Sequence, residues 1–251
     1  MPPTAPGWSA RPSAVVLYGR NPVREAVRGP RRVERIWATE RAIASEGWLR
    51  AEGATPATAA DIEARCASAE HQGVCAEVAA YRYADADGLL AAEDALVVCL
   101  DEVQDPHNLG AVCRVAESAG AAGVVIPERR AAEVTPAAAK AAAGAVEHLA
   151  VARVGNLANW LGRAKDAGAW VYGAEAGDGA VPYATLDYGG RVVLVLGSEG
   201  RGLRPRVAAC CDELIALPQR GRVNSLNVST AAAALLYGIL QLRGTGLDSA
   251  P

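Results

Sequence analysis

The sequence contains no phenylalanine, one methionine, three histidines and only two lysines among its 251 residues. The histidines, His71, His107 and His148, are scattered, and the six cysteines show no Cys-x-x-Cys spacing. Because structural metal sites are built from closely spaced ligands of these types, we expect no metal site. Arginine and alanine are abundant instead, a bias from which we draw no functional conclusion.

Long hydrophobic runs are also missing. The apolar segment Val228–Leu240 is shorter than the roughly 20 residues that a membrane span needs, so it predicts a buried helix or a helix at a subunit interface. The N-terminus shows no charged segment followed by an apolar core of the kind that directs secretion. We therefore expect a cytoplasmic protein with reduced thiols and no membrane attachment.

Positive charge is concentrated near the N-terminus, although the whole chain carries a net charge of −3. Residues 1–50 contain nine arginines and four glutamates, which leaves five positive charges. A local basic face can bind the phosphates of a nucleic acid, and the alternative is an ordinary solvated surface. The candidate arginines are Arg20, Arg24, Arg28, Arg31, Arg32 and Arg35.

The arrangement of apolar segments and turn residues predicts two domains and a tail. Residues 1–12 have the proline-rich composition of a disordered tail, residues 13–80 predict a small α/β domain, and residues 81–94 form an acidic, alanine-rich linker. Strand and helix patterns then alternate through residues 95–245. This alternation predicts an α/β domain with a mostly parallel sheet.

The first polar motif follows an apolar run at residues 95–100, which has the composition of a buried strand. A polar loop and a helix of small and apolar residues come next. Within this segment Asn108 is placed to cap the helix, Gly110 permits close approach of another element, and Arg114 lies on roughly the same side as Gly110. For each residue alone, a plain helix cap and a surface arginine are the simpler explanations.

The second motif is a glycine-rich loop, Leu196–Leu203, that contains Glu199. It follows the apolar run Val192–Leu196, so its glycines lie at the carboxyl end of a strand, where α/β proteins bind ligands. Its spacing differs from both the dinucleotide-binding fingerprint and the phosphate-binding P-loop. A carboxylate in this turn would repel a phosphate and suits a cation or an RNA hydroxyl or amino group. The alternative is a solvated turn glutamate.

The third motif contains Leu217, Pro218 and the run Asn-Ser-Leu-Asn-Val-Ser at residues 224–229. Its polar side chains precede the predicted apolar helix, where Asn224 or Ser225 can cap the first turn. Capping alone is the simplest explanation of this motif by itself. The presence of the other two motifs favours a shared site instead.

In their order, spacing and intervening strands, the three motifs resemble those of the SpoU/TrmH family of RNA 2′-O-ribose methyltransferases in the SPOUT superfamily. The resemblance covers residues 15–243 and implies a trefoil-knotted parallel-sheet methyltransferase domain at the C-terminal end. A small ribosomal-protein-like α/β domain that binds RNA precedes it. The resemblance also implies S-adenosyl-L-methionine as cofactor and a homodimer with the active site near the interface. No pattern in the sequence predicts a knot independently, because knots are rare.

The resemblance further implies roles for individual residues. Those implied in catalysis are Asn108, Arg114, Glu199, Ser225 and Asn227. Those implied in cofactor binding are Gly197, Leu217 and Leu226 through their backbones, Leu196 and Gly200 in the same loop, and Ile215 and Pro218 along the adenosine pocket.

Arg114 matches the family arginine often proposed as general base. A guanidinium normally stays protonated, with a pKa above about 12, so removal of a proton by this group requires a large perturbation. We favour an electrostatic role, in which Arg114 binds the neighbouring 3′-phosphate and stabilises the developing alkoxide.

The RNA target is the least determined feature. The small N-terminal domain and the sequence His-Gln-Gly-Val at residues 71–74 most resemble enzymes that methylate a guanosine of 23S ribosomal RNA during rRNA processing. Two alternatives remain: methylation of transfer RNA, and a catalytically inactive RNA-binding factor in ribosome assembly. The intact motif residues count against the inactive factor.

Overall fold

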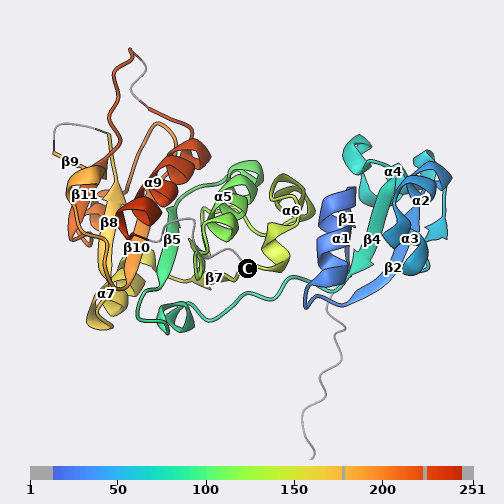
Figure 1. Ribbon diagram of the computed structural model, residues 1–251, viewed down its shortest axis with the longest axis horizontal. Coiled ribbons are helices and arrows are strands. Elements are labelled where there is room, and N and C mark those ends of the chain that lie inside the picture. Colours follow the sequence, from blue (N-terminus) through green and yellow to red (C-terminus); the bar gives the residue numbers. More distant parts are fainter. Residues whose placement is uncertain (1–13, 177–178, 223–224, 245–251) are drawn as a thin grey trace, which may run out of the picture. The chain divides into compact units, whose positions relative to one another are not determined.

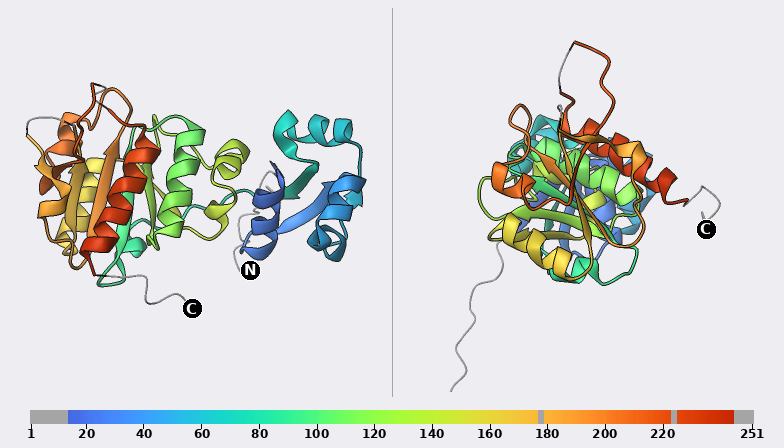
Figure 2. Two further views of the ribbon diagram at one scale, coloured as in Figure 1. Left: turned by 45° about the horizontal axis from the view of Figure 1, so that its top comes forward. Right: turned by 90° about the vertical axis from the view of Figure 1, so that its left-hand side faces the viewer.

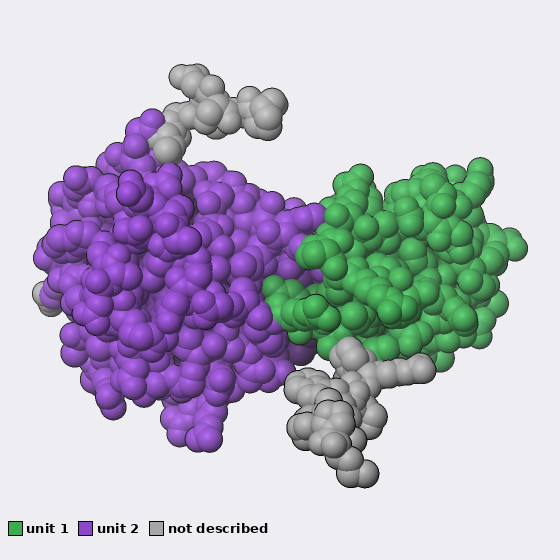
Figure 3. Space-filling view, turned by 90° about the horizontal axis from the view of Figure 1, so that it is seen from below, with its two compact units in different colours: residues 1–82 green, residues 83–251 purple. Residues whose placement is uncertain are grey.

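The structure, a computed structural model, describes residues 14–176, 179–222 and 225–244. It divides into two compact units, residues 1–82 and 83–251 (Figure 3). The predicted tail at residues 1–12 and the last residue of the predicted second domain lie outside the described residues.

The boundary between the units falls inside the segment predicted as a linker, residues 81–94. Most of that segment belongs to the second unit. Its short 3-10 helix, η2 (Asp87–Leu90), buries Leu89 and Leu90 in the hydrophobic core of this unit. Residues 83–94 are therefore part of the second unit and not a linker. The acidic composition of this segment outweighed its two buried leucines in the prediction.

The first unit is a four-stranded sheet with short helices. The strands lie in the order β1-β4-β2-β3, in which β4 is antiparallel to both of its neighbours and β3 is parallel to β2. The strands are β1 (Val15–Tyr18), β2 (Val33–Ala38), β3 (Thr55–Pro56) and β4 (Val74–Val78). The helices are α1 (Arg20–Arg28), α2 (Glu40–Ser45), α3 (Gly47–Ala51), α4 (Ala59–Cys66) and η1 (Ala69–His71).

The candidate basic face of the first unit is largely engaged in contacts of its own. Arg31 lies over the ring of Tyr81, and Arg35 lies over the ring of Trp37. The ion pairs are Arg20–Glu46 at 3.1 Å, Arg24–Glu25 at 3.1 Å, Arg28–Glu25 at 3.4 Å and Arg32–Glu34 at 2.9 Å. Much of the predicted positive charge is therefore paired with glutamates on the same unit.

The second unit is a seven-stranded sheet in which every adjacent pair of strands is parallel, as the sequence predicted. Its order is β7-β6-β5-β10-β8-β11-β9. The strands are β5 (Leu96–Asp101), β6 (Gly123–Pro127), β7 (Val151–Val154), β8 (Trp170–Ala174), β9 (Val181–Pro182), β10 (Val192–Gly197) and β11 (Glu213–Ala216). The helices are α5 (Pro106–Ser118), α6 (Pro136–Ala141), η3 (Ala145–Glu147), α7 (Leu157–Asp166), η4 (Tyr183–Thr185), α8 (Pro205–Ala208) and α9 (Val228–Leu242).

Helices cover both faces of this sheet (Figures 1 and 2). The covering explains why β5, β6 and β10 are buried along nearly their whole length rather than at alternate residues. Val97 and Val195 pack with Trp160 and Leu161 of α7 in one core. On the opposite face α5 and α9 lie side by side (Figure 2).

Because the strands are parallel, their carboxyl ends lie at one edge of the sheet. The segments that follow β5, β10 and β11 carry the three polar motifs, so the topology brings these distant parts of the chain to the same edge. None of the helices within the described ranges is long and apolar enough to cross a membrane.

Candidate active site

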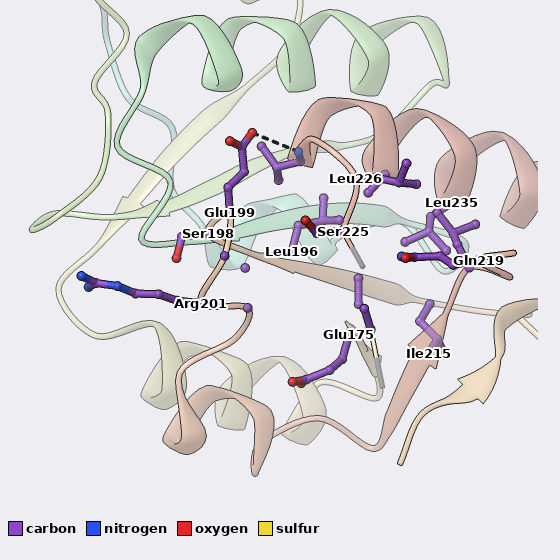
Figure 4. Close-up of a pocket in the computed structure, with 18 residues that line it drawn as sticks. Glu175, Leu196, Ser198, Glu199, Arg201, Ile215, Gln219, Ser225, Leu226 and Leu235 are labelled. Carbon is purple, nitrogen blue, oxygen red and sulfur yellow. Dashed lines mark hydrogen bonds between the residues drawn. The ribbon is translucent and has the colours of Figure 1, made fainter. Parts of the chain in front are cut away.

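A cavity of about 330 Å³ opens at the carboxyl ends of β8, β10 and β11 (Figure 4). We call it the cofactor cavity, because residues that the family resemblance implies in cofactor binding line it. Pro218 is exposed and does not line it, although both of its chain neighbours do. The predicted residues that line it are Leu196, Gly197, Glu199, Gly200, Ile215, Leu217, Ser225 and Leu226.

The walls of the cofactor cavity combine apolar side chains and glycines with six polar side chains, those of Glu175, Ser198, Glu199, Arg201, Gln219 and Ser225. Leu196, Ile215 and Leu235 are buried and form its interior surface, whereas Leu226 is 44% exposed at its mouth. Ser225 also lines the cavity, and its hydroxyl makes no hydrogen bond with a described residue. The arrangement fits a ligand with an aromatic or aliphatic body and a few polar groups.

The glycine loop after β10 folds back on itself. Gly200 and Gly202 have left-handed backbone conformations, with φ of +77° and +66°. The Gly202 amide donates a hydrogen bond to the Ser198 carbonyl over 2.9 Å, which closes the turn. A Cβ added at Gly197 would lie 2.2 Å from the carbonyl carbon of Gly202, so glycine is required there for the loop to close.

One carboxylate oxygen of Glu199 joins the three motifs. The amide of Asn108 donates to Oε1 over 3.1 Å, and the amide of Asn227 donates to the same oxygen over 2.5 Å. The Asn227 amide also donates to Oδ1 of Asn108 over 2.9 Å. Oε2 of Glu199 accepts no hydrogen bond from a described residue. We call Asn108, Glu199 and Asn227 the polar triangle, and its free oxygen is available to a ligand.

Helix α5 is capped by Asp105, whose carboxylate accepts from the backbone amide of His107 over 2.9 Å. This corrects the prediction that Asn108 caps the helix. Pro106 occupies the first helical turn, which is a favoured position for proline, so the helix begins earlier than predicted. Asn108 therefore lies inside the first turn, where its side chain reaches Glu199.

Helix α9 is capped by Asn227, whose Oδ1 accepts from the backbone amide of Ser229 over 2.9 Å. The predicted caps were Asn224, which lies outside the described residues, and Ser225, which precedes the helix. Asn227 thus uses its oxygen for the cap and its nitrogen for Glu199. The cap fixes the orientation of the amide that completes the polar triangle.

Arg114 lies on α5 with an exposed side chain that makes no hydrogen bond or ion pair with another described residue. It does not line the cofactor cavity. Gly110, one turn earlier, packs against α6, where an added Cβ would lie 2.3 Å from the carbonyl oxygen of Ala138. Within one copy of the chain, no described contact joins Arg114 to the polar triangle.

The prediction from the three motifs did not include an ion pair that anchors the glycine loop. Asp101 at the end of β5 is buried, and it accepts from Nε of Arg204 over 2.8 Å and from the Arg204 backbone amide over 2.9 Å. The hydrogen bond between the side chains of Asp101 and Arg204 raises the pKa of Arg204. The motifs also missed Glu175, which follows β8 and lines the cavity. The rule that ligands bind at carboxyl strand ends would have found both acidic residues.

Among the described residues, no group of three or more His, Cys, Asp or Glu side chains is placed to hold a metal ion. The polar side chains of this site are instead amides, two hydroxyls, single carboxylates and the guanidinium of Arg201. Such groups orient a ligand through hydrogen bonds.

Two family models match the chain. The SpoU rRNA Methylase family matches residues 95–237, and the model for RNA 2′-O ribose methyltransferase substrate binding matches residues 16–84. YacO of Bacillus subtilis, assigned to the TrmH family of tRNA/rRNA methyltransferases, is 39% identical over 241 residues, which cover 90% of this chain and 95% of YacO. A Staphylococcus haemolyticus protein with the same assignment is 38% identical over 251 residues, or 94% and 99% of the two chains.

Solved structures resemble the fold over most of its length. The SpoU methyltransferase AviRb of Streptomyces viridochromogenes in complex with AdoMet has a TM-score of 0.77 and 25% identity, over 93% of this chain and 91% of AviRb. The AdoMet-bound rRNA methyltransferase of Sinorhizobium meliloti has a TM-score of 0.75 and 25% identity, over 91% and 87% of the two chains. This chain belongs to the SpoU/TrmH family of RNA methyltransferases.

Proposed function

We propose that this protein is an S-adenosyl-L-methionine-dependent 2′-O-ribose methyltransferase whose target is a guanosine of 23S ribosomal RNA. The observation that carries the proposal is the polar triangle, which places the free oxygen of Glu199 beside an apolar cavity. A ribose hydroxyl is a hydrogen-bond donor that this oxygen can accept. The family model for 2′-O ribose methyltransferase substrate binding supports the ribose as the acceptor.

The cofactor cavity fits S-adenosyl-L-methionine by its chemistry. Leu196 and Ile215 supply apolar walls for an adenosine, and the backbones at Gly197, Leu217 and Leu226 supply polar groups along the rim. Gly200 has open space around its Cα, so the loop backbone can approach a ligand closely. When bound, S-adenosyl-L-methionine supplies an electrophilic methyl group. The AdoMet complexes of AviRb and the Sinorhizobium meliloti enzyme support this assignment.

The chain's own residues then align the acceptor hydroxyl. Glu199 accepts its hydrogen bond, while Asn108 and Asn227 hold the carboxylate in place through neutral amides that add no competing charge. Ser225, with a free hydroxyl at the cavity, contacts the RNA backbone. Arg114 binds the adjacent 3′-phosphate and stabilises negative charge on the 2′-oxygen as the proton of the hydroxyl passes to water.

We further propose that the active protein is a cytoplasmic homodimer, with residues 13–80 as the RNA-binding domain and a trefoil knot in the second. Two observations support the dimer. Tyr237 and Leu242 on α9 are exposed apolar side chains, at 48% and 44%. Arg114 is exposed and separate from the polar triangle, so a second copy can bring it to the site. A monomer that is fully active, measured by light scattering beside the methyl-transfer assay, would contradict the dimer.

The experiment that tests the function is transfer of labelled methyl groups from S-adenosyl-L-methionine to unmodified 23S ribosomal RNA and bulk transfer RNA, with mapping of 2′-O-methylated nucleotides. Wild type and Arg114→Ala are compared. We expect one ribose methylation in ribosomal RNA, lost in the variant. Base methylation, or undiminished activity of Arg114→Ala, would contradict the proposed chemistry.

Transfer RNA is the second candidate substrate. The assignment of YacO to tRNA/rRNA methyltransferases leaves both RNAs open, and the chain also resembles the TrmH/SpoU tRNA modifying enzyme of A. aeolicus, with a TM-score of 0.55 over 62% of its length. That match is less complete than the matches to AviRb and the Sinorhizobium meliloti enzyme. Labelling of transfer RNA in the same assay would identify transfer RNA, rather than 23S ribosomal RNA, as the substrate.

A further inference from the structure

A second hollow, of about 270 Å³, lies beside the cofactor cavity. Ser198, Glu199, Arg201 and Val228 line both, so the two hollows meet at the glycine loop. The other wall of the second hollow is formed by residues 102–105 and by Asn108 of the polar triangle. A group bound here would touch the same carboxylate that faces the cofactor cavity. We call this space the nucleotide hollow.

Glu102 is the distinctive residue of the nucleotide hollow. Its φ is +57°, a left-handed conformation that is unfavourable for a residue with a side chain and that glycine adopts freely. Its side chain is only 10% exposed, and Arg130 and Arg204 each contact Oε1 over 3.4 Å. Oε2 accepts no hydrogen bond from a described residue. The chain therefore holds a nearly buried carboxylate, with one free oxygen, at a position where glycine would be less strained.

The remaining groups of the hollow define what it can recognise. Arg201 is exposed and has no ion-pair partner among the described residues, and Gln104 presents an unengaged amide. The hollow thus offers carboxylate acceptors beside a cation. Guanine matches this set, because its N1–H and 2-amino groups donate side by side while O6 and N7 accept from an arginine. Adenine and cytosine place a ring acceptor next to their amino group, and a carboxylate repels it.

We propose that the nucleotide hollow receives the target base and that Glu102 selects guanine by accepting from its N1–H and 2-amino edge. This inference rests on the proposed function, because it takes a ribonucleotide of the RNA as the ligand. It adds a specificity-determining residue that none of the three motifs contains.

The test uses the full-length protein and a short RNA that spans the mapped target, made with guanosine or with inosine, which lacks the 2-amino group. For wild type we expect kcat/KM to fall about tenfold on the inosine RNA, the effect of one lost hydrogen bond to a charged group. Glu102→Gly should lower kcat/KM on guanosine RNA by a similar factor and should no longer distinguish the two RNAs. Its affinity for S-adenosyl-L-methionine and its melting temperature should stay near wild type, since glycine suits this backbone.

Two control variants separate the effect of Glu102 on base recognition from other effects of the substitution. Glu117→Gln removes a carboxylate from α5 away from the hollow and should leave the discrimination intact. Glu102→Gln keeps the side chain and one acceptor, and it should discriminate less than wild type even if the glycine variant is unstable. A target other than guanosine, equal rates of wild type on both RNAs, or unchanged discrimination in both Glu102 variants would overturn the inference while leaving methyl transfer intact. Failure of wild type to methylate any RNA would instead overturn the proposed function.

Discussion

The two hollows that meet at the glycine loop differ sharply in chemistry. Apart from the four residues that line both, the cofactor cavity is walled mainly by alanines, leucines, an isoleucine and glycines, with Glu175, Gln219 and Ser225 as its polar side chains. The rest of the nucleotide hollow is walled by two carboxylates, two amides and one valine. Glu199 lines both, and its position is fixed by Asn108 and Asn227. A single loop can therefore separate a cavity with many apolar walls from a hollow lined mainly by hydrogen-bonding groups, and one carboxylate, that of Glu199, lies between them.

The largest effect on activity is expected from Asn227→Asp, which changes one residue of the polar triangle. Aspartate is as good a helix cap as asparagine, so α9 should keep its stability. It also places a second carboxylate against Glu199 and removes the amide donor, and methyl transfer should fall about a hundredfold. The measurement is kcat together with melting temperature. Asn156→Asp, the same substitution at the cap of α7, is the matched control. Equal activity of the two variants would show that the polar triangle is dispensable.

A smaller effect is expected at the cofactor cavity, where Gly197→Ala should weaken cofactor binding. Its Cβ would meet the backbone of Gly202, so the loop must shift. We expect a loss of about 1–3 kcal/mol in the free energy of unfolding and about tenfold weaker binding of S-adenosyl-L-methionine by calorimetry. Gly162→Ala is the control, since nothing lies within 4 Å of its added Cβ. Unchanged cofactor affinity in Gly197→Ala would separate the loop from the cofactor site.

The smallest effect concerns charge. RNA affinity should fall as salt rises, whereas affinity for S-adenosyl-L-methionine, which carries no phosphate, should change little. Arg114→Ala should reduce the salt slope for RNA by about one, because Arg114 is the residue proposed to bind a phosphate and has no ion-pair partner among the described residues. Arg28→Ala should change the slope less, since Arg28 is already paired with Glu25. An RNA affinity independent of salt would contradict contacts between these arginines and the RNA phosphates.

Much of the second unit could be predicted from the sequence, because its buried strands are short apolar runs and its turns are marked by glycine and proline. The run at residues 192–196 and the glycines after it, for example, match β10 and its loop. The family also followed from the three motifs, because their order along the chain is itself informative. These features are local, and local composition determines them.

The polar triangle could not be predicted from local pattern. Asp105 and Asn108 are both good helix caps, and only the structure decides between them. The hydrogen bonds between Asn108, Glu199 and Asn227 join segments far apart in the chain, and sheet order alone brings them together. Glu102 escaped notice for a related reason: its left-handed backbone is a property of the fold that no neighbouring residue signals.

In the proposed complex, the target base and the cofactor occupy different hollows on the two sides of Glu199. The most direct measurement is photo-crosslinking of an RNA that carries 6-thioguanosine at the mapped target, with the protein saturated in S-adenosylhomocysteine, followed by mass spectrometry of the linked peptide. We expect crosslinks within residues 102–108 and 198–201. Crosslinks confined to the walls of the cofactor cavity at residues 215–219 or 231–235 would contradict it.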